Sequence, residues 1–377
     1  MKRARSTLAA LAVFLTPLAA QDVEEVYDSR PIMVTPEHET AVGRGLEWLA
    51  THQNEDGSWT SKIGYKLNSD YRETKEDGHV GVTALAGTAF LAGGHLPERG
   101  EYGAVVDRAL NFVLRAADDD GYITYAGSRM YSHAFATLFL AEICGMTHRQ
   151  DVRGKLQKAV DFIVDTQNDE GGWRYVPFSP ESDMSIVVCQ VIALRAARNI
   201  GIRVPKATID RAAKYVVESA ITEESQKSFH ASMYADEIGA FHYQRGKGSR
   251  SSFPLTAAGV TALHGLGIYS DDSIRRGLDY LKTHLLPFNS QFGQRDGGHY
   301  FFWYGHYYGV QAMYTAGTSY QVNYWEPYFE TVRAELLEMQ NEDGSWPNRT
   351  GPGPPFGTAM AVLILEIPYR YLPIFQR

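Results

Sequence analysis

Apolar residues recur at helical spacing through most of the chain, in segments of two alternating kinds. Segments of the first kind keep a charged face, such as Arg44 with Glu47 or Lys155 with Lys158. Segments of the second kind are apolar and rich in small residues almost throughout, which is typical of helices buried on most sides. The second kind covers residues 79–91, 131–143, 183–196, 255–266, 305–314 and 357–367. The pattern predicts exposed outer helices that alternate with buried inner helices.

A heptapeptide of the form Gln-Asn-x-x-Gly-x-Trp occurs three times, beginning at Gln53, Gln167 and Gln340. Each copy follows a predicted outer helix and precedes a loop and an inner helix. Weaker copies fill the gaps between them and bring the number of units to about six. The turn glycines of the units are Gly57, Gly121, Gly171, Gly239, Gly297 and Gly344. Glycine suits these turns because it adopts a positive φ without steric cost.

Six helix pairs can close into a double ring, with inner helices around an axis and outer helices exposed. We therefore expect an all-α fold, a single (α/α)6 toroid over residues 37–377. An open solenoid of the tetratricopeptide or HEAT type is the alternative. Its units would be more regular in length than these, which vary by some twenty residues.

The three Gln-x-x-x-Gly-x-Trp copies resemble the Gln-Trp repeat of squalene and oxidosqualene cyclases and of protein prenyltransferase β subunits. The resemblance covers nearly the whole chain from about residue 37. It implies a terpenoid cyclase-like or prenyltransferase-like toroid, in which the Gln closes a helix end and the Trp stacks near the next unit. These are structural roles, so the repeat identifies an architecture and says little about chemistry.

Squalene–hopene-type cyclases carry Asp-x-Asp-Asp-Thr at the start of an inner helix, and the middle Asp protonates an alkene. At the matching place this chain has Glu181-Ser182-Asp183-Met184-Ser185. The resemblance thus assigns the proton donor to Asp183, with Glu181 as a neighbour and Met184 at the third acidic position. A purely structural interpretation, in which Asp183 or Ser182 caps the inner helix, is the one that the residues favour, because carboxylates and hydroxyls satisfy the free N–H groups there.

The resemblance also sets limits on the activity. Triterpene cyclases resemble two such barrels, whereas this chain has the length of one. Prenyltransferase β subunits hold zinc with Asp, Cys and His late in the chain, and here the late candidates Asp296, His299 and His306 have no Cys among them. We therefore expect no metal and no cofactor.

The N-termini of the inner helices should meet at one mouth of the ring, which would gather His79, His133, Asp183 and His306. Histidines beside carboxylates can exchange protons or, as an alternative that stays open at this mouth, bind a metal. Each His considered singly is more often a helix cap or a satisfied buried residue. We list Asp183, Glu181 and His306 as candidate catalytic residues, and His79 and His133 as candidate ligand-binding residues.

Residues 299–308 are dense in aromatic side chains, which can stabilise cations or stack on sugars and apolar chains. Tyr304 is a further catalytic candidate, and Trp303, Tyr307 and Tyr308 are candidate ligand-binding residues. An aromatic core beneath a long loop is the competing interpretation.

The N-terminal segment has the features of a signal peptide over residues 1–20, followed by an extension over residues 21–36. Lys2, Arg3 and Arg5 precede an apolar stretch that ends at Ala19-Ala20. An uncleaved anchor is the alternative. Cleavage would leave no stable membrane span and would change the net charge from −8 to −11. The sequence therefore predicts a secreted or periplasmic protein.

Composition restricts the partners. The chain is 44% hydrophobic, carries 36 basic and 44 acidic residues, and contains no basic run that would bind phosphates. Nucleic acid is therefore excluded as a partner. Cys144 and Cys189 lie in apolar helical stretches, and both free thiols and a disulfide are compatible with export.

Three functions fit these observations. The leading hypothesis is an exported protein whose axial cavity binds an apolar or isoprenoid-like ligand, with or without acid chemistry at Asp183. The second is a non-catalytic module that binds another exported protein through its long loops, such as residues 222–254. The third is a carbohydrate-active enzyme, with Tyr304 or His306 as base, Asp183 as its partner and Trp303 against the sugar. Whether the protein catalyses any reaction stays open.

Overall fold

The computed structural model describes residues 34–64, 73–224, 237–245, 250–287 and 300–375. Its contacts divide the chain into two units, Met1–Pro31 and Ile32–Arg377, and every described residue lies in the second. The segments predicted as a signal peptide and an extension therefore lie almost wholly outside the described residues and remain predictions. None of the described helices is both long enough and apolar enough to cross a membrane.

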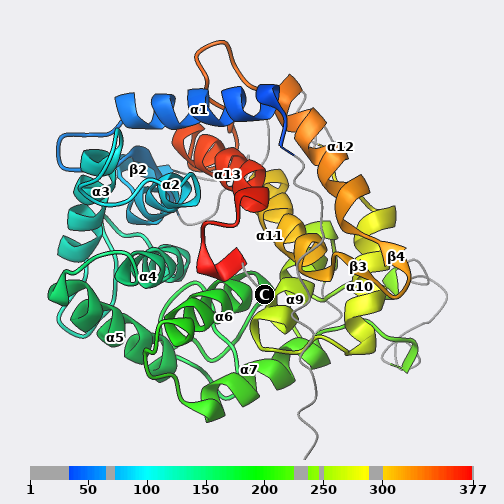
Figure 1. The fold of residues 1–377 in the computed structure, drawn as a ribbon. Helices are drawn as coiled ribbons and strands as arrows, with labels where there is room; N and C mark the ends of the chain where they lie inside the picture. The colour runs from blue at the N-terminus through cyan, green and yellow to red at the C-terminus, as the bar shows by residue number, and fades with distance from the viewer. Residues whose placement is uncertain (1–33, 65–72, 225–236, 246–249, 288–299, 376–377) are drawn as a thin grey trace, which may run out of the picture. The chain divides into compact units, whose positions relative to one another are not determined.

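The described residues form twelve α-helices, six inner and six outer, which confirms the predicted all-α toroid (Figure 1). The inner helices are α2 (Val80–Ala92), α4 (Met130–Cys144), α6 (Met184–Asn199), α9 (Phe253–Gly265), α11 (Tyr300–Ala316) and α13 (Pro354–Glu366). The outer helices are α1 (Pro36–Thr51), α3 (Gly103–Arg115), α5 (Gln150–Asp165), α7 (Lys206–Glu218), α10 (Asp272–Thr283) and α12 (Trp325–Glu338). The loops between helices also contain two antiparallel strand pairs. These are β1 (Thr60–Gly64) with β2 (Glu73–Gly78), and β3 (Thr318–Ser319) with β4 (Val322–Asn323).

The inner ring is closed. Each inner helix packs against the next in chain order, and α13 packs back against α2 (Figure 1). The outer helix α1 covers α13 and touches α12, so the first helix of the chain covers the last inner one. The inner helices are buried around most of their circumference, as their nearly continuous apolar sequences predicted.

The Gln of each heptapeptide joins neighbouring units. The side-chain amide of Gln53 donates to the carbonyl of Gly57 in its own turn, at 3.0 Å, and to the carbonyl of Val105 in α3, at 2.9 Å. The amides of Gln167 and Gln340 repeat this pattern, reaching Thr208 in α7 and Ala41 in α1. Each Gln therefore closes its turn and also ties it to the next outer helix.

The turn glycines lie directly against that next helix. Gly57 has φ +92°, and a Cβ built on it would lie 2.2 Å from the carbonyl oxygen of Arg108. The same positive φ and the same close approach to an outer-helix carbonyl recur at Gly121, Gly171, Gly239 and Gly344. Gly297 lies outside the described residues. Only glycine fits these five places, because any side chain would meet backbone.

The Trp of each heptapeptide binds the end of the outer helix that precedes it. The indole N–H groups of Trp59, Trp173 and Trp346 donate at 2.7–2.8 Å to backbone carbonyls in the last turns of α1, α5 and α12. All three rings are buried. The N–H therefore contacts the Trp's own unit. The resemblance implied stacking near the next unit, and the ring of Trp346 does lie against Gly45 of α1, the next outer helix around the ring.

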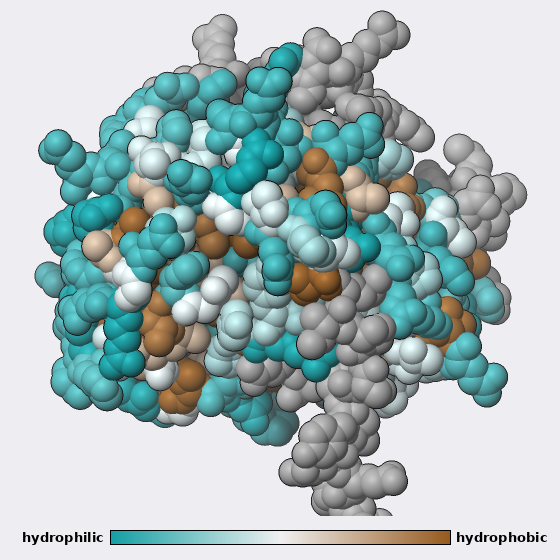
Figure 2. Space-filling model, turned by 45° about the horizontal axis from the view of Figure 1, so that its top comes forward, coloured by the Kyte–Doolittle hydropathy of each residue, from teal (hydrophilic) through white to brown (hydrophobic). Residues whose placement is uncertain are grey.

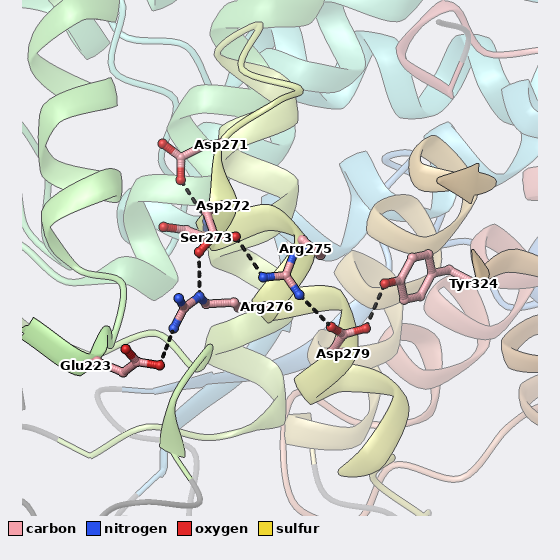
Figure 3. A network of polar contacts seen from close by, with 8 residues as sticks. All are labelled: Glu223, Asp271, Asp272, Ser273, Arg275, Arg276, Asp279 and Tyr324. Atoms are coloured by element: carbon pink, nitrogen blue, oxygen red, sulfur yellow. Dashed lines mark hydrogen bonds and ion pairs between the residues drawn. The ribbon is translucent and has the colours of Figure 1, made fainter. Parts of the chain in front are cut away.

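Charged residues on the outside add exposed ion pairs (Figure 3). On α10, Arg276 pairs with Asp272 and Glu223, and Arg275 pairs with Asp272 and Asp279. The Tyr324 hydroxyl, just before α12, donates to Asp279 at 2.7 Å. Exposed pairs of this kind contribute little stability, at most about 1 kcal/mol each.

The chain's last described residues lie at the centre of the ring (Figure 1). The 3₁₀-helix η3 (Pro373–Phe375) packs against α6, and Leu372 and Ile374 are buried. A small cavity lies beside Ile374, at the C-terminal ends of α6, α9 and α11, and Arg195, His264 and Gln311 line part of it. This end of the inner ring is covered by the chain itself.

Replacing Gly57 by Ala should lower the free energy of unfolding by about 2–4 kcal/mol, because the positive φ and the Arg108 carbonyl both oppose a Cβ. Gly154→Ala in α5 is the matched control, since a Cβ there meets nothing within 4 Å. The control should gain about 0.5–1 kcal/mol through helix propensity. Urea unfolding of both variants measures the difference, and equal effects would contradict the role of the turn.

Candidate functional site

Asp183 caps the N-terminus of α6. Its backbone is extended, at φ −141°, and its Oδ1 accepts hydrogen bonds from the Ile186 amide at 3.1 Å and from the Ser185 hydroxyl. The side chain is completely buried. Its second oxygen, Oδ2, has no hydrogen-bond partner among the described residues. The capping interpretation is therefore correct, yet a cap needs only one of the two oxygens.

Burial raises the pKa of Asp183 to about 6. The hydrogen bonds from Ser185 and Ile186 and the positive charge of Arg174 lower this pKa and partly offset the effect of burial. A substantial fraction of the molecules therefore carries a protonated carboxyl group near pH 6. Such a group can donate a proton, which an ordinary exposed Asp cannot do at this pH.

Four tyrosines surround this carboxyl group. Tyr131 comes from α4 and Tyr304 from α11, and their rings lie edge to face with centroids 6.4 Å apart. Tyr175 and Tyr243 come from the loops before α6 and α9, and their hydroxyls are hydrogen-bonded to each other. Burial raises the pKa of all four, so they are neutral. The surroundings of Asp183 are thus largely aromatic, and the nearby charged side chains include Arg174 with its partner Glu181, and Glu170, which accepts from the amide of Ser182.

Further along α6 from Asp183, side chains of α4, α6 and α11 contact one another around the axis of the ring. The Tyr304 hydroxyl donates to the carbonyl of Ser185 at 3.0 Å, and the Tyr308 hydroxyl lies 3.0 Å from Sγ of Cys189. The second contact lies one helical turn after the first on both α6 and α11, so the two helices run parallel. Tyr307 meets Phe135 of α4, with ring centroids 6.2 Å apart. Aromatic side chains therefore occupy the ring interior at this level.

Both cysteines are free thiols, on α4 and α6. Burial raises the pKa of Cys189 to about 12, so its thiol stays protonated. A protonated, buried thiol packs as a small apolar side chain and is a poor nucleophile.

Glu181 forms an ion pair with Arg174, and its side chain is 45% exposed. Met184, at the third acidic position of the family motif, is buried. Asp183 therefore has neither of the carboxylates that the resemblance supplies as close neighbours.

The three histidines are held by other hydrogen bonds at separate places. His79 caps α2 by accepting from the Val82 amide at 3.3 Å, and His133 bonds to the backbone of Ile123 and Ala159. His306 bonds to the Tyr328 hydroxyl and the carbonyl of Leu286. Burial lowers the pKa of each to about 4, so the rings are neutral. The described residues contain no group of His, Cys, Asp and Glu that could hold a metal.

The aromatic candidates on α11 divide between two directions. Tyr304, Tyr307 and Tyr308 face the axis, as their contacts with Ser185, Phe135 and Cys189 show. Trp303 is completely buried, and its indole N–H donates to the carbonyl of Pro347 at 3.2 Å. Trp303 is thus a core residue and is not placed to stack on a ligand. His299 lies outside the described residues.

Sequence reasoning did not select Tyr131, Tyr175 or Tyr243 as site residues. A signal for two of them was present: Tyr175 and Tyr243 both lie four residues after a turn glycine and two after a buried aromatic residue, Trp173 or Phe241. Because the two tyrosines occupy equivalent positions in two different units, they lie at the same mouth of the ring. Aligning the repeats beyond the heptapeptide would have found this pair.

Similar proteins agree with this architecture. No protein-family model matches the chain. A segment of 184 residues, 48% of this chain, is 27% identical to drimenyl diphosphate synthase of Streptomyces showdoensis and covers 31% of it. A segment of 159 residues, 40% of this chain, is 24% identical to a probable squalene–hopene cyclase of Sinorhizobium fredii and covers 24% of it. The chain therefore matches a third or less of the length of these relatives.

Solved structures share the fold across most of the chain. The type II terpene cyclase MstE from Scytonema, in complex with geranylgeranyl dihydroxybenzoate, matches with a TM-score of 0.58 and 13% identity over 89% of this chain and 98% of its own. An inactive variant of an α-1,6-mannanase of Salegentibacter, bound to α-1,6-mannotriose, matches with a TM-score of 0.60 and 10% identity over 88% and 98%. The relatives and the fold fit the squalene cyclase and prenyltransferase toroid superfamily.

The raised pKa of Asp183 predicts a pH-dependent difference in stability between the protein and its Asp183→Asn variant. A carboxyl group whose pKa is higher when folded destabilises the fold as the pH rises from about 4 to about 6. Relative to Asp183→Asn, which keeps the cap, the protein should lose about 3 kcal/mol over this range. Urea unfolding from pH 4 to 7.5 tests it, and a difference that does not change with pH would contradict it.

Proposed function

We propose that the protein is a terpenoid-cyclase-like enzyme that binds an apolar, isoprenoid-like substrate at the Asp183 mouth of the inner ring. The observation that carries the proposal is the buried Asp183 carboxyl, whose Oδ2 has no partner among the described residues and whose pKa is raised to about 6. The aromatic surroundings suit an uncharged, unsaturated chain. The terpene cyclases among the sequence relatives and structural neighbours support the same class of substrate.

The proposed reaction begins with transfer of the Asp183 proton to one carbon of a trisubstituted alkene. The π electrons form the new C–H bond, and the other carbon becomes a tertiary cation. A second alkene of the substrate attacks this cation and closes a ring, which moves the positive charge to a carbon of that second alkene. The electrons of a neighbouring C–H bond then form the alkene of the product, and the proton of that bond passes to solvent water. The faces of Tyr131, Tyr175, Tyr243 and Tyr304 offer negative electrostatic potential to the cation. Solvent then returns a proton to the carboxylate.

Substrate entry requires the mouth to open. The hydrogen-bonded pair Tyr175 and Tyr243 lies at this mouth, and both rings are only partly buried. Both tyrosines interact electrostatically with Asp183, so their separation is the movement that we propose for entry. Their closure afterwards would keep water away from the cation.

The α-1,6-mannanase neighbour keeps a carbohydrate-active enzyme as a second candidate. The geometry favours it less. Glycoside hydrolysis generally uses a pair of carboxyl groups, and here Glu181 is paired with Arg174. Of the two expected bases, His306 has both ring nitrogens bonded, and burial raises the pKa of Tyr304. Trp303 is buried.

The interaction module depends on residues 222–254, which lie partly outside the described residues. On the face shown in Figure 2, apolar residues form separate patches within a mainly hydrophilic surface. A docking surface for another protein gains no support from this face. Export with residues 1–20 as a signal peptide remains part of our proposal, as does a secreted or periplasmic location.

Incubation with linear isoprenoids in D₂O tests the proposal. The panel should contain a neutral hydrocarbon, a diphosphate and a chain with an aromatic head. We expect a cyclic product that carries one deuterium at the protonated carbon. Asp183→Asn should lower the rate by at least about 10²-fold.

The matched control is Asp271→Asn, because Asp271 also caps a helix, α10, but on the outer ring. This control should keep full turnover. Turnover retained by Asp183→Asn, or an absence of both binding and turnover across the panel, would overturn the proposal. Hydrolysis of α-1,6-linked mannan in its place would favour the second candidate.

A further inference from the structure

We propose that Ser185 and Tyr131 are positioning residues for Asp183, which hold its Oδ1 and leave the acidic proton on Oδ2. The inference deepens the proposed function and rests on it for its catalytic meaning. Its structural part, the location and ease of loss of the proton, can be tested without any substrate.

The two side chains form a chain of hydrogen bonds that ends on one oxygen. The Tyr131 hydroxyl donates to Oγ of Ser185 at 2.6 Å, and the Ser185 hydroxyl donates to Oδ1 of Asp183. The amide of Ile186 gives Oδ1 a second donor at 3.1 Å. Ser185 is buried and Tyr131 is partly buried. These contacts join α4 to the first turn of α6.

The direction of the chain determines which oxygen carries the proton. A hydroxyl has a single hydrogen, so Ser185 can donate to Asp183 while it accepts from Tyr131. Oδ1 then accepts two hydrogen bonds and acts as the carbonyl-like oxygen of the neutral acid. The proton therefore lies on Oδ2, the buried atom without a partner among the described residues. Oδ2 is the atom that would face the alkene.

The same donors stabilise the carboxylate after the proton has left. Hydrogen bonds from Ser185 and Ile186 lower the pKa of Asp183, against the larger effect of burial. In the related motif this acidity depends on neighbouring acidic residues, and here Met184 and the Arg174-paired Glu181 do not supply it. Neutral hydroxyl donors thus take the place of charged neighbours in this chain.

The other titratable groups around Asp183 are neutral or fixed. Charge interactions link it to Tyr131, Tyr175, Tyr215, Tyr243, Tyr304 and Cys189, and to the cation Arg174. Two acidic side chains also lie on the adjoining segment: Glu181 is held in its ion pair with Arg174, and Glu170 accepts from the amide of Ser182 at 2.7 Å. Burial keeps the tyrosines and the cysteine protonated over the range in which Asp183 titrates. The titration of Asp183 can therefore be followed alone.

The experiment measures the titration of Asp183 by infrared absorption of its protonated carboxyl group, assigned as the band that Asp183→Asn removes. Ser185→Ala should raise the pKa of Asp183 by about one unit or more, because a donor to the carboxylate is lost. Ser185→Thr keeps a hydroxyl and should restore the original value. Tyr131→Phe should raise the pKa by a smaller amount, because it acts through Ser185.

Ser182→Ala is the matched control. Ser182 is the neighbouring buried serine, and its hydroxyl donates to Asn168 at 2.9 Å instead of to Asp183. This variant should leave the titration unchanged. If the proposed reaction is also found, Ser185→Ala should move the alkaline limb of its pH profile upward by the same amount as the infrared titration.

An unchanged titration in both Ser185→Ala and Tyr131→Phe would overturn the inference, as would a shift in Ser182→Ala equal to that in Ser185→Ala. If Ser185→Ala does not fold, Tyr131→Phe with Ser185→Thr decides the outcome. A shifted titration without turnover of any isoprenoid would support the positioning role and count only against the proposed function. The two failures are therefore distinguishable.

Discussion

The whole ring depends on one contact, in which the turn after an outer helix lies against the backbone of the next outer helix. A glycine with positive φ permits the close approach, as Gly57 does at Arg108, and in the three full heptapeptides a Gln amide adds a hydrogen bond across it. The last copy, at Gln340 and Gly344, makes this contact with α1. The contact that joins neighbours therefore also closes the circle. A closed ring has no terminal unit with an uncovered apolar face, so no separate capping element is needed.

Closure of the ring also creates the environment of Asp183. Inner helices of one direction bring their N-terminal ends and preceding loops to the same mouth, so residues distant in sequence become neighbours. Tyr131, Tyr175, Tyr243 and Tyr304 come from four different units and together remove Asp183 from water. Helix capping fixes one carboxyl oxygen, and the surrounding rings leave the other without a partner among the described residues. The raised pKa of Asp183 is thus a consequence of the architecture more than of any local motif.

The fold was predictable from the sequence because its signals are repeated and local. The inner helix expected over residues 79–91 is Val80–Ala92, and the one expected over 183–196 is Met184–Asn199. The site was less predictable. Asp183 was found through its place in a motif. The histidines could not be assigned in this way, because a His at a helix start has the same sequence signature whether it caps a helix or binds a ligand. His133, for example, has both ring nitrogens bonded to backbone. Trp303 could not be separated from Tyr304, because the direction of each side chain depends on how α11 is rotated against α12 and the axis.

The site combines two demands that oppose each other. A strong proton donor must be protonated at working pH and yet able to lose its proton, so burial alone is not sufficient. Burial raises the pKa of Asp183, and the hydroxyl of Ser185 lowers it again, which leaves a value near 6. Charged neighbours would lower the cost of ionisation through a network of several carboxyl groups, but they would also bring water into the ring. In this chain neutral donors make the adjustment, through the hydrogen bonds from Tyr131 to Ser185 and from Ser185 to Asp183. The aromatic packing around Asp183 and the hydrogen bonds that set its acid strength are therefore compatible in this ring.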